Sequence, residues 1–341
     1  MAVTKAMSTQ PLENILEAIG RTPIVRLRRI GADLPMPLFA KIEFLNPGGS
    51  VKDRMAVHII NKAEQEGRLK PGGTIVESTS GNTGVGLAMV AAVRGYKAII
   101  TMPDKMSAEK IGLLKAFGAE VIITPTNVPP DSPESLYETA KRVARETPGS
   151  FYANQYYNLD NIEAHYLTTG PELYEQTEGQ IDCLIAGVGT GGTISGTGRF
   201  LKEKNPSVKV VAIDPEGSIY YDWFKSRTMT EPKTYKVEGI GEDILAETLD
   251  FTLIDDMVRI NDRESFEMAR RLTTEEGIFA GGSSGSALVG AVRWLAAHPE
   301  IRYPVVILPD SGSRYLSKIF SDQWMRDNGF LQKTPQLTEQ T

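Results

Sequence analysis

Short apolar runs, each followed by a stretch with helical spacing, are the feature that most constrains how this chain can fold. Six such runs lie at 74–79, 97–103, 120–125, 183–188, 208–214 and 303–310. They are apolar throughout rather than alternating with polar residues, which is typical of strands buried on both faces of a parallel sheet. The sequence therefore predicts an α/β fold with helices on both sides of parallel strands.

The intervening helices have recognisable ends. Residues 87–94 have helical spacing and stop before Gly95, a residue type typical of the position just after a helix. Further helices are predicted at 107–117 and 133–146, the second with Asp131 and Ser132 as candidate N-caps. The strand–helix pattern restarts after ANQYYN, so we expect a domain boundary near 150–155, and 341 residues suffice for roughly two domains.

Composition and charge exclude several classes of protein. Lys and Arg number 37 against 43 Asp and Glu, and a net charge of −6 disfavours nucleic acid as a partner. No apolar run approaches the ~20 residues that span a bilayer, and the first residues lack the apolar core of a signal peptide. Cys183 is the single cysteine and the three histidines are widely spaced, so no disulfide framework and no metal site are expected. We expect a soluble, cytoplasmic protein.

The motif GVGTGG, residues 187–192, joins a predicted strand to a predicted helix. Its glycines at 187, 189 and 192 match G-x-G-x-x-G, and Asp214 ends the next strand, as in dinucleotide-binding proteins. What the pattern indicates physically is bare amides at a helix N-terminus, which bind an anionic phosphate. Thr190 and Thr193 add hydroxyl donors, which suits one compact phosphate. The alternative is a tight turn that serves packing alone.

A second motif, NPGGSVKDR at 46–54, predicts a turn followed by a helix that begins near Ser50. Lys52 then falls in the first helical turn, where the positive end of the helix disfavours its ammonium form. Such a lysine is a candidate amine nucleophile or base. The alternative is an ordinary solvated lysine.

A third motif, ESTSGNTG at 77–84, places hydroxyl and amide donors between a strand end and a helix start near Thr83. The donors are Thr79, Ser80, Asn82 and Thr83, and together they form a good seat for a carboxylate. Weaker signals are the hydroxyl-rich turn GGSSGS at 281–286 and FYANQYYN at 151–158, near the expected boundary. The acidic segment 241–251 is expected to lie on the surface rather than to hold paired catalytic acids.

An amine, a cup for one phosphate and a carboxylate seat are the parts that pyridoxal 5′-phosphate and an amino acid require. With NPGGSVKDR, TSGNTG and GTGGT in this order, the chain resembles the cysteine synthase and cystathionine β-synthase family of fold type II pyridoxal-phosphate enzymes. The resemblance runs from IGRTPIVRL (19–27) to LPDSGSRYLSKIFSDQWM (308–325). It implies two domains, each with a mostly parallel sheet flanked by helices: a smaller, substrate-carboxylate-binding domain at 45–155, and a larger, cofactor-phosphate-binding domain of 1–44 plus 156–325. Residues 326–341 would form a polar tail.

The resemblance also implies a role for each matching residue. Lys52 would be the catalytic lysine that holds the cofactor as a Schiff base, Asn82 would bind the ring hydroxyl, and Ser283 would face the pyridine nitrogen. The phosphate would be held by Gly189, Thr190, Gly191, Gly192 and Thr193. The substrate would meet Thr79, Ser80, Thr83, Gln155 and Tyr156, with Glu238 and Gly239 at the entrance for the second substrate.

Within the family, segments such as DPEGSI (214–219) and VEGIGEDI (237–244) resemble the cystathionine-forming branch. The expected reaction joins serine, or O-acetylserine, to homocysteine in transsulfuration, and the expected assembly is a homodimer. Glu242 departs from that branch, whose animal and yeast members carry a tyrosine there. No Cys or His precedes His58 and the chain ends soon after the catalytic core, so we expect neither heme nor a C-terminal regulatory domain pair. The alternatives are a cysteine synthase that uses sulfide and, from another class, an NAD-dependent oxidoreductase, which would leave Lys52 and TSGNTG unexplained.

Overall fold

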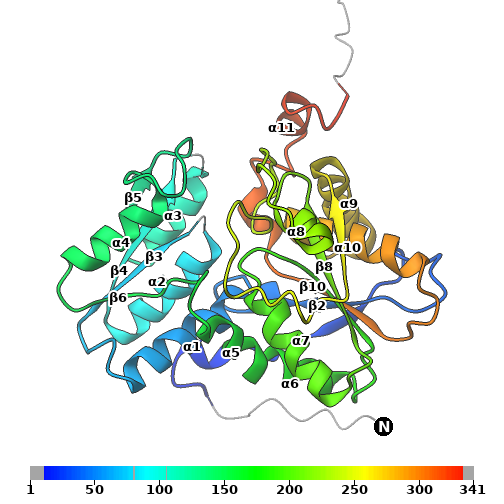
Figure 1. The fold of residues 1–341 in the computed structure, drawn as a ribbon, viewed down its shortest axis with the longest axis horizontal. Coiled ribbons are helices and arrows are strands. Elements are labelled where there is room, and N and C mark those ends of the chain that lie inside the picture. Colours follow the sequence, from blue (N-terminus) through cyan, green and yellow to red (C-terminus); the bar gives the residue numbers. More distant parts are fainter. Residues whose placement is uncertain (1–10, 80, 105, 333–341) are drawn as a thin grey trace, which may run out of the picture. The chain divides into compact units, whose positions relative to one another are not determined.

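The computed structural model describes residues 11–79, 81–104 and 106–332, and it divides into two compact units. Unit 1 comprises Met1–Thr22 and Leu45–Asn154, and unit 2 comprises Pro23–Phe44 and Gln155–Thr341. Each unit has its own sheet and its own helices (Figure 1). The predicted α/β class, with two mostly parallel sheets flanked by helices, is confirmed.

Unit 2 is built on a six-stranded sheet with the order β1-β2-β10-β7-β8-β9. The strands are β1 (Ile24–Arg26), β2 (Phe39–Ile42), β7 (Cys183–Gly187), β8 (Lys209–Pro215), β9 (Asp256–Ile260) and β10 (Pro304–Leu308). All neighbours are parallel except β1, which runs antiparallel to β2. The central strands β7, β8 and β10 are those that the apolar runs predicted.

Burial on both faces explains why these strands are apolar throughout. In β10, Val306 and Leu308 belong to one apolar cluster, and Val305 and Ile307 belong to another. Successive side chains of a strand point to opposite faces, so the two clusters lie on opposite sides of the sheet. The first cluster includes side chains of α9 (Asp262–Glu276) and α10 (Gly282–Ala296). The second includes side chains of α6 (Thr169–Gln176) and α7 (Gly192–Lys204).

In the described part of the chain, unit 2 also contains the helices α5 (Asp160–Leu167), α8 (Tyr220–Ser226) and α11 (Asp322–Asp327). The 3-10 helix η3 (Gly312–Tyr315) follows β10. The short η2 (Glu43–Leu45) crosses from unit 2 into unit 1. Helix α5 packs against α7, a contact that matters below for the glycine-rich loop.

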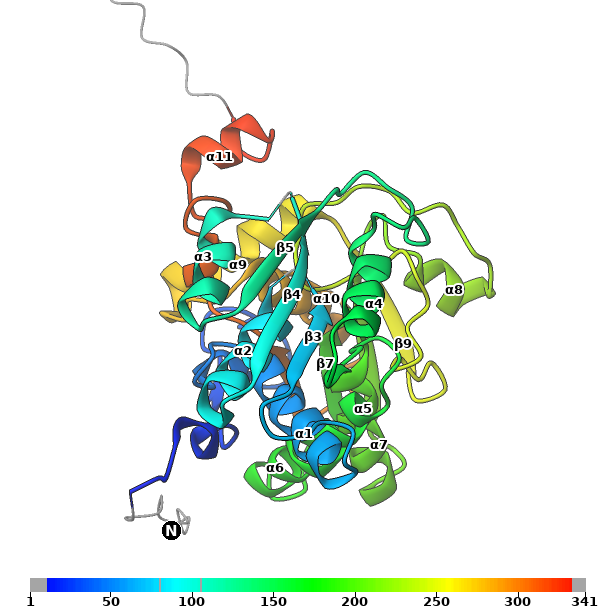
Figure 2. The same cartoon turned by 90° about the vertical axis from the view of Figure 1, so that its left-hand side faces the viewer.

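Unit 1 has a four-stranded parallel sheet with the order β5-β4-β3-β6. Its strands are β3 (Thr74–Ser78), β4 (Lys97–Pro103), β5 (Glu120–Thr124) and β6 (Ser150–Tyr152). Its helices are η1 (Ile15–Ala18), α1 (Lys52–Gln65), α2 (Asn82–Arg94), α3 (Ala108–Ala116) and α4 (Leu136–Glu146). Figure 2 shows these helices around β3, β4 and β5. The helix α2 ends as predicted at Gly95, which is left-handed at φ 73°.

Two local expectations differ from the structure. The N-cap of α4 is Ser135, whose side chain accepts the amide of Glu138, and neither Asp131 nor Ser132 caps the helix. A proline-rich turn with its own hydrogen bonds occupies 129–135 and delays the helix start. The segment 241–251 is not simply surface, because Ala246, Thr248 and Leu249 are buried.

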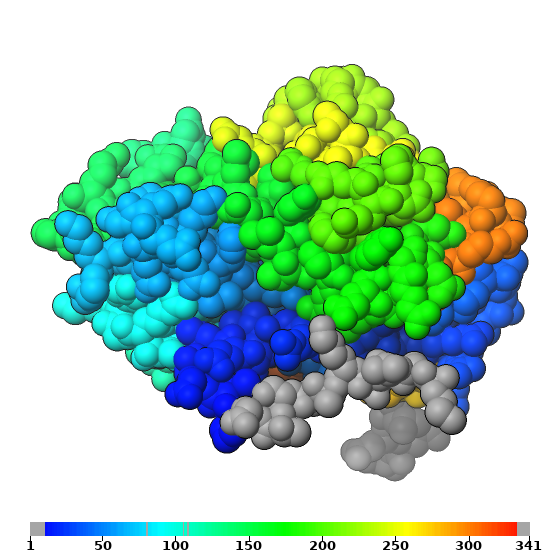
Figure 3. All heavy atoms as spheres, turned by 90° about the horizontal axis from the view of Figure 1, so that it is seen from below, coloured from blue at the N-terminus to red at the C-terminus, as the bar shows by residue number. Residues whose placement is uncertain are grey.

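The N-terminal residues up to Thr22 group with unit 1, whereas the expected division placed 1–44 together in the larger domain. The Asn46 side chain accepts the amide of Gly20 at 2.8 Å, and Arg54 donates to the Thr22 hydroxyl at 3.2 Å. Helix η1 also contacts α2. In Figure 3 the start of the described chain lies in dark blue beside the lighter blue and cyan segments of unit 1. Among the described residues, no helix is long and apolar enough to cross a membrane.

Candidate active site

Lys52 is the first residue of α1, so it lies in the first helical turn as predicted, although the helix begins two residues later than the expected start near Ser50. The buried carboxylate of Asp53 accepts the amide of Gly48 at 2.6 Å and so ties the preceding turn to the helix. A Cβ at Gly48 would lie 2.5 Å from Asp53 Oδ1, which explains why glycine stands there. The amide of Lys52 donates to the Ser50 hydroxyl at 3.2 Å. The side chain of Lys52 therefore leaves from a fixed backbone position.

The carboxylate-seat motif in unit 1 lies at the start of α2, which packs against α1. Thr79 is buried just after β3, and its hydroxyl accepts the amide of Gly81 at 3.1 Å. Asn82 and Thr83 are the first two residues of α2. The close approach of α2 to α1 depends on Gly86, whose Cβ would lie 2.9 Å from that of Ala56. Ser80, the remaining residue of the predicted seat, lies outside the described residues.

A cation that sequence reasoning missed lies beside this motif. Lys110 of α3 is largely buried, and its Nζ lies 3.5 Å from the position that a Cβ at Gly81 would take. Helix α3 packs against α2, and Lys110 thereby lies next to the predicted carboxylate seat. The sequence contained no signal for it, since Lys110 stands in an ordinary helical stretch.

The glycines of GVGTGG in unit 2 are required because other parts of the chain pack directly against them. A Cβ at Gly189 would lie 2.8 Å from the carbonyl oxygen of Gly239, and one at Gly191 would lie 2.4 Å from Cβ of Leu249. One at Gly192 would overlap the Asn161 side chain of α5 at 2.1 Å. Gly196, one turn further along α7, meets α5 in the same way. Packing thus explains why glycines stand in this motif. A tight packing turn and a phosphate-binding loop are compatible interpretations of it.

The same packing leaves the amides of the loop available to a ligand. In the described part of the chain, no backbone hydrogen bond uses the amide of any residue from 189 to 193 as its donor. These amides precede or form the first turn of α7, where the helix itself provides no acceptors. Consecutive undonated amides at the positive end of a 13-residue helix are an anion-binding arrangement.

The hydroxyl of Thr190 is oriented by its neighbours. It accepts a hydrogen bond from Nδ2 of Asn161 at 3.1 Å, so its own hydrogen remains to be donated elsewhere. The Thr248 hydroxyl holds the loop from the other side by donating to the Thr190 carbonyl at 2.5 Å. Asn161 and Thr248 also bond to the carbonyl of Gln155, at 2.9 and 3.3 Å. The loop and the predicted substrate residues Gln155 and Tyr156 are therefore brought together within unit 2.

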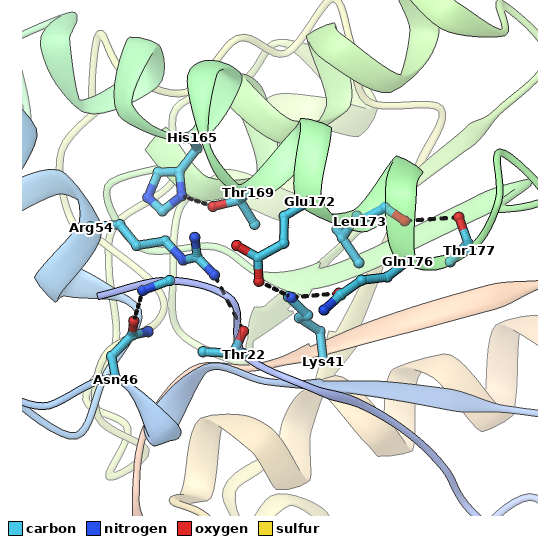
Figure 4. Close-up of polar contacts among 11 residues, drawn as sticks. Thr22, Lys41, Asn46, Arg54, His165, Thr169, Glu172, Leu173, Gln176 and Thr177 are labelled. Carbon is cyan, nitrogen blue, oxygen red and sulfur yellow. Dashed lines mark hydrogen bonds and ion pairs between the residues drawn. The ribbon is translucent and has the colours of Figure 1, made fainter. Parts of the chain in front are cut away.

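Thr193 is linked to a buried histidine that the sequence did not single out. His165 of α5 is fully buried, with Nε2 3.2 Å from the Thr193 hydroxyl and Nδ1 2.8 Å from the Thr169 hydroxyl. Figure 4 shows the contact of His165 with Thr169. It also shows Glu172 and Gln176, further along α6, which contact the buried Lys41 of β2, with 2.7 Å between Lys41 Nζ and Gln176. The contacts of His165 hold α5 to α6 and to Thr193, and those of Lys41 hold α6 to β2.

Ser283 lies in the first turn of α10, within the hydroxyl-rich motif at 281–286. It is 2% exposed, and its hydroxyl bonds to no residue in the described part of the chain. The neighbouring Ser284 hydroxyl, rather than that of Ser283, is among the fully buried polar atoms without a hydrogen-bond partner in the described residues. The Ser283 hydroxyl is therefore available to a bound group.

The segment 237–240 joins this helix start to the glycine-rich loop. Val237 Cγ2 lies 3.5 Å from the position of a Cβ at Gly282, and the carbonyl of Gly239 lies against Gly189. Glu238 stands between these two contacts, and its side chain forms an ion pair with Lys318 at 2.6 Å. Unit 2 thus gathers the predicted residues of 155–156, 189–193, 238–239 and 283.

Asp214 does not have the role that a dinucleotide site would give it. It ends β8 as predicted, but it is fully buried, and its Oδ2 accepts the amide of Tyr221 at 2.9 Å. Burial raises the pKa of its carboxyl to about 7. A ribose hydroxyl cannot reach this side chain, so the structure removes the argument for an NAD-dependent oxidoreductase. Among the described residues, no group of three or more His, Cys, Asp or Glu could hold a metal ion.

Comparison with known proteins agrees with this geometry. A family model described as pyridoxal-phosphate dependent enzyme matches residues 15–310. The chain belongs to this family. Among curated relatives, the cystathionine beta-synthase of Apis mellifera is 50% identical over 326 residues, which cover 95% of this chain and 64% of the relative. That of Saccharomyces cerevisiae is 44% identical, covering 92% and 64%. The chain spans roughly three fifths of the length of these relatives.

Two solved structures of the same fold are similar over nearly the whole chain. An O-ureido-L-serine synthase is 36% identical with a TM-score of 0.85, covering 96% of this chain and 98% of that one. A hydrogen sulfide-producing enzyme from Fusobacterium nucleatum is also 36% identical, with a TM-score of 0.83, covering 90% and 100%. The expected fold type II architecture and the expected resemblance to cystathionine β-synthase are both confirmed.

The residues present fit pyridoxal phosphate. The loop 189–193 offers amides and two hydroxyls to a single phosphate. Other segments of the chain occupy the space that a side chain at its glycines would need. Ser283, a 2% exposed residue in the first turn of α10, supplies a neutral hydroxyl. Lys52 supplies an amine at a fixed helix start.

Proposed function

We propose that this protein catalyses a pyridoxal-phosphate-dependent β-replacement that joins serine, or O-acetylserine, to homocysteine and gives cystathionine, in transsulfuration. The observation that carries the proposal is the loop 189–193, whose undonated amides and oriented Thr190 hydroxyl form a cup for one phosphate. Identity of 44–50% to several cystathionine beta-synthases, against 36% to the two enzymes of other names, supports the choice of product.

In this proposal unit 2 binds the cofactor phosphate. Gly189, Thr190, Gly191, Gly192 and Thr193 would hold it through their amides and the two hydroxyls. His165 and Asn161 would keep those hydroxyls directed at the phosphate oxygens, because each already bonds to one of them. Unit 1 provides Lys52, which would attach the cofactor, and Asn82, which would bind its ring hydroxyl.

Bound pyridoxal phosphate would supply an electron-withdrawing ring that stabilises negative charge at the substrate Cα. Lys52 acts as the general base that removes the Cα proton, since an amine at the start of a helix is disfavoured as a cation. The substrate then loses its β-hydroxyl or acetate group, and the thiol sulfur of the second substrate bonds to the β-carbon. Ser283 is neutral and would leave the ring nitrogen mostly unprotonated, which favours prompt β-elimination over transamination.

The remaining predicted residues would orient the substrates. Thr79, Ser80, Thr83 and Gln155 would bind the carboxylate of the first amino acid, and Tyr156 would line its pocket. Glu238 and Gly239 would meet the second substrate. Hydroxyl and amide donors at the start of α2 suit a carboxylate because the helix N-terminus carries a partial positive charge.

A product assay tests this function directly. Purified enzyme is supplied with serine or O-acetylserine, each combined with homocysteine or with sulfide, and the products are separated by mass. We expect cystathionine from homocysteine with at least one donor. If sulfide gives cysteine and homocysteine gives no cystathionine with either donor, the protein is a cysteine synthase and the proposal is wrong.

We also propose a homodimer, as the family resemblance implies, and a cytoplasmic location, which the composition favours. Light scattering on the purified protein and cell fractionation test these two points.

A further inference from the structure

The proposed function assigns Glu238 to the second substrate but gives no role to the ion pair that Glu238 forms with Lys318 in unit 2. The two side chains meet at 2.6 Å and are largely shielded from water, with exposures of 14% and 23%. They come from segments 80 residues apart in the sequence. Moving two charges out of water costs free energy, and this cost can exceed the attraction between them. A shielded ion pair is therefore weak evidence that its role is only to stabilise the fold.

The pair lies beside both ends of the proposed cofactor site. Glu238 belongs to the segment whose Val237 touches the start of α10 near Ser283 and whose Gly239 touches Gly189 of the phosphate loop. Gly239 itself is exposed, whereas Val237 and Ile240 are buried on either side. Glu238 is thus held between the residues proposed for the cofactor ring nitrogen and those proposed for its phosphate.

The C-terminal segment that carries Lys318 is also held at the start of α10. Its amide bonds to the carbonyl of Tyr315, whose hydroxyl donates to the buried Asp310 at 2.6 Å. The Tyr315 ring lies against Gly281, the N-cap of α10. Val237, Ile240, Tyr315 and Ile319 pack in one apolar cluster, so apolar contacts already join the two segments without the ion pair.

We propose that the Glu238–Lys318 pair recognises the amino-acid end of the second substrate, with Glu238 binding its α-ammonium and Lys318 binding its α-carboxylate. A zwitterion carries one charge of each sign on neighbouring atoms, and the pair presents the complementary charges together. Because both side chains are partly shielded, charge-assisted hydrogen bonds to them are stronger than in open water. This inference rests on the proposed function and names how homocysteine is selected over thiols without an amino-acid group.

The test compares nucleophiles on the holoenzyme. The variants Glu238→Gln and Lys318→Met are assayed with homocysteine, and in parallel with sulfide and with 2-mercaptoethanol, which carry no zwitterion. We expect the KM for homocysteine to rise by about tenfold to a hundredfold, the effect of losing one charge-assisted hydrogen bond. The KM for the first substrate, the rates with sulfide and 2-mercaptoethanol, and the visible absorption of the cofactor should stay within about twofold.

Two further variants separate recognition from structural support. The matched control is Lys202→Met, which removes an ion pair to Asp255 of similar length and shielding in the same unit, and it should leave every KM unchanged. The charge-swapped double variant Glu238→Lys/Lys318→Glu restores an ion pair in reversed order. Recovery of thermal stability without recovery of the homocysteine KM supports recognition. The reversed charges would bind the α-ammonium and α-carboxylate in exchanged positions, so the thiol would point in a different direction.

Equal losses with all three nucleophiles, or recovery of homocysteine KM in the charge-swapped variant, would overturn the inference. Failure of the proposed function looks different, since the wild-type enzyme would then form no cystathionine at all. Direct binding provides a readout besides turnover. Calorimetric titration of homocysteine into the wild-type holoenzyme should give a Kd that the two single variants weaken by a similar factor.

Discussion

At the scale of single residues, Lys52 is the position on which the proposed chemistry depends most. Its side chain leaves the first residue of α1, and the turn before it is tied to the helix by Asp53. The amine serves both to attach the cofactor and to move the Cα proton, and water replaces neither role efficiently.

We therefore expect Lys52→Ala to abolish turnover while the protein remains folded. Steady-state assays should show a loss of at least about a thousandfold, within the range by which positioned bases and nucleophiles accelerate reactions. Circular dichroism and thermal unfolding of the same preparation check the fold. Substantial activity in a clean preparation would remove Lys52 from the mechanism.

Thr190 is the residue whose hydroxyl is most clearly oriented for a ligand. Thr190→Ala removes a donor to the phosphate, worth roughly 1.5–3 kcal/mol for a charge-assisted bond. We expect the cofactor Kd to rise by about tenfold to a hundredfold, with kcat largely restored at saturating cofactor. The exposed Thr228 offers a control, since Thr228→Ala should change neither value. If saturating cofactor did not restore kcat, Thr190 would act in the chemistry rather than in binding.

At the scale of elements, the glycine-rich loop combines close packing with ligand binding. Its glycines let Gly239, Leu249 and α5 approach the backbone, and that approach fixes the amides in place. A side chain at Gly191 would face both a steric overlap with Leu249 and a left-handed backbone, with φ at 88°.

Gly191→Ala should lower the free energy of unfolding by about 2–5 kcal/mol, the sum of backbone strain and overpacking. The comparison is Gly277→Ala, at the end of α9, where φ is 70° but no atom lies within 4 Å of the new Cβ. There the loss should be only about 1 kcal/mol. Urea unfolding of both variants, with cofactor titrations alongside, checks the difference. Equal losses would show that the contact with Leu249 yields easily.

At the scale of the whole molecule, the buried Asp214 makes stability depend on pH. Burial raises the pKa of its carboxyl to about 7 from the ordinary value of 3.8. Between these values the folded protein keeps a proton that the unfolded chain has lost. The free energy of unfolding therefore falls as pH rises through this window, and it stops falling above about pH 7.

Asp214→Asn removes the titration but keeps an oxygen that can accept the amide of Tyr221. The stability of the variant minus that of the wild type should grow by on the order of 1–3 kcal/mol between pH 5 and pH 8. Urea unfolding at both pH values measures it, and the titration of all other groups cancels in the difference. A difference that does not change with pH would mean that Asp214 is ionised throughout. Cofactor affinity should be unaffected, since Asp214 is fully buried and is assigned no ligand contact in this proposal.

Much of the fold was predictable because it follows from local pattern. Apolar runs predicted β3, β4, β5, β7, β8 and β10 to within one or two residues at most ends. Gly95 predicted the end of α2, and the turn motif predicted that Lys52 lies in the first turn of a helix. These features depend on residues close in sequence, whose periodicity and capping are readable without the rest of the chain.

What the tertiary structure decided involves contacts between residues far apart in the chain. The burial of Asp214, the grouping of the N-terminal residues with unit 1, and the hold of Asn161 and Thr248 on Thr190 are of this kind. So is the ion pair of Glu238 with Lys318. The sequence by itself determined which elements form and which residues could carry the chemistry. Which of those residues meet, and which polar groups are shielded from water, depends on side-chain packing between distant segments, and no local pattern encodes it.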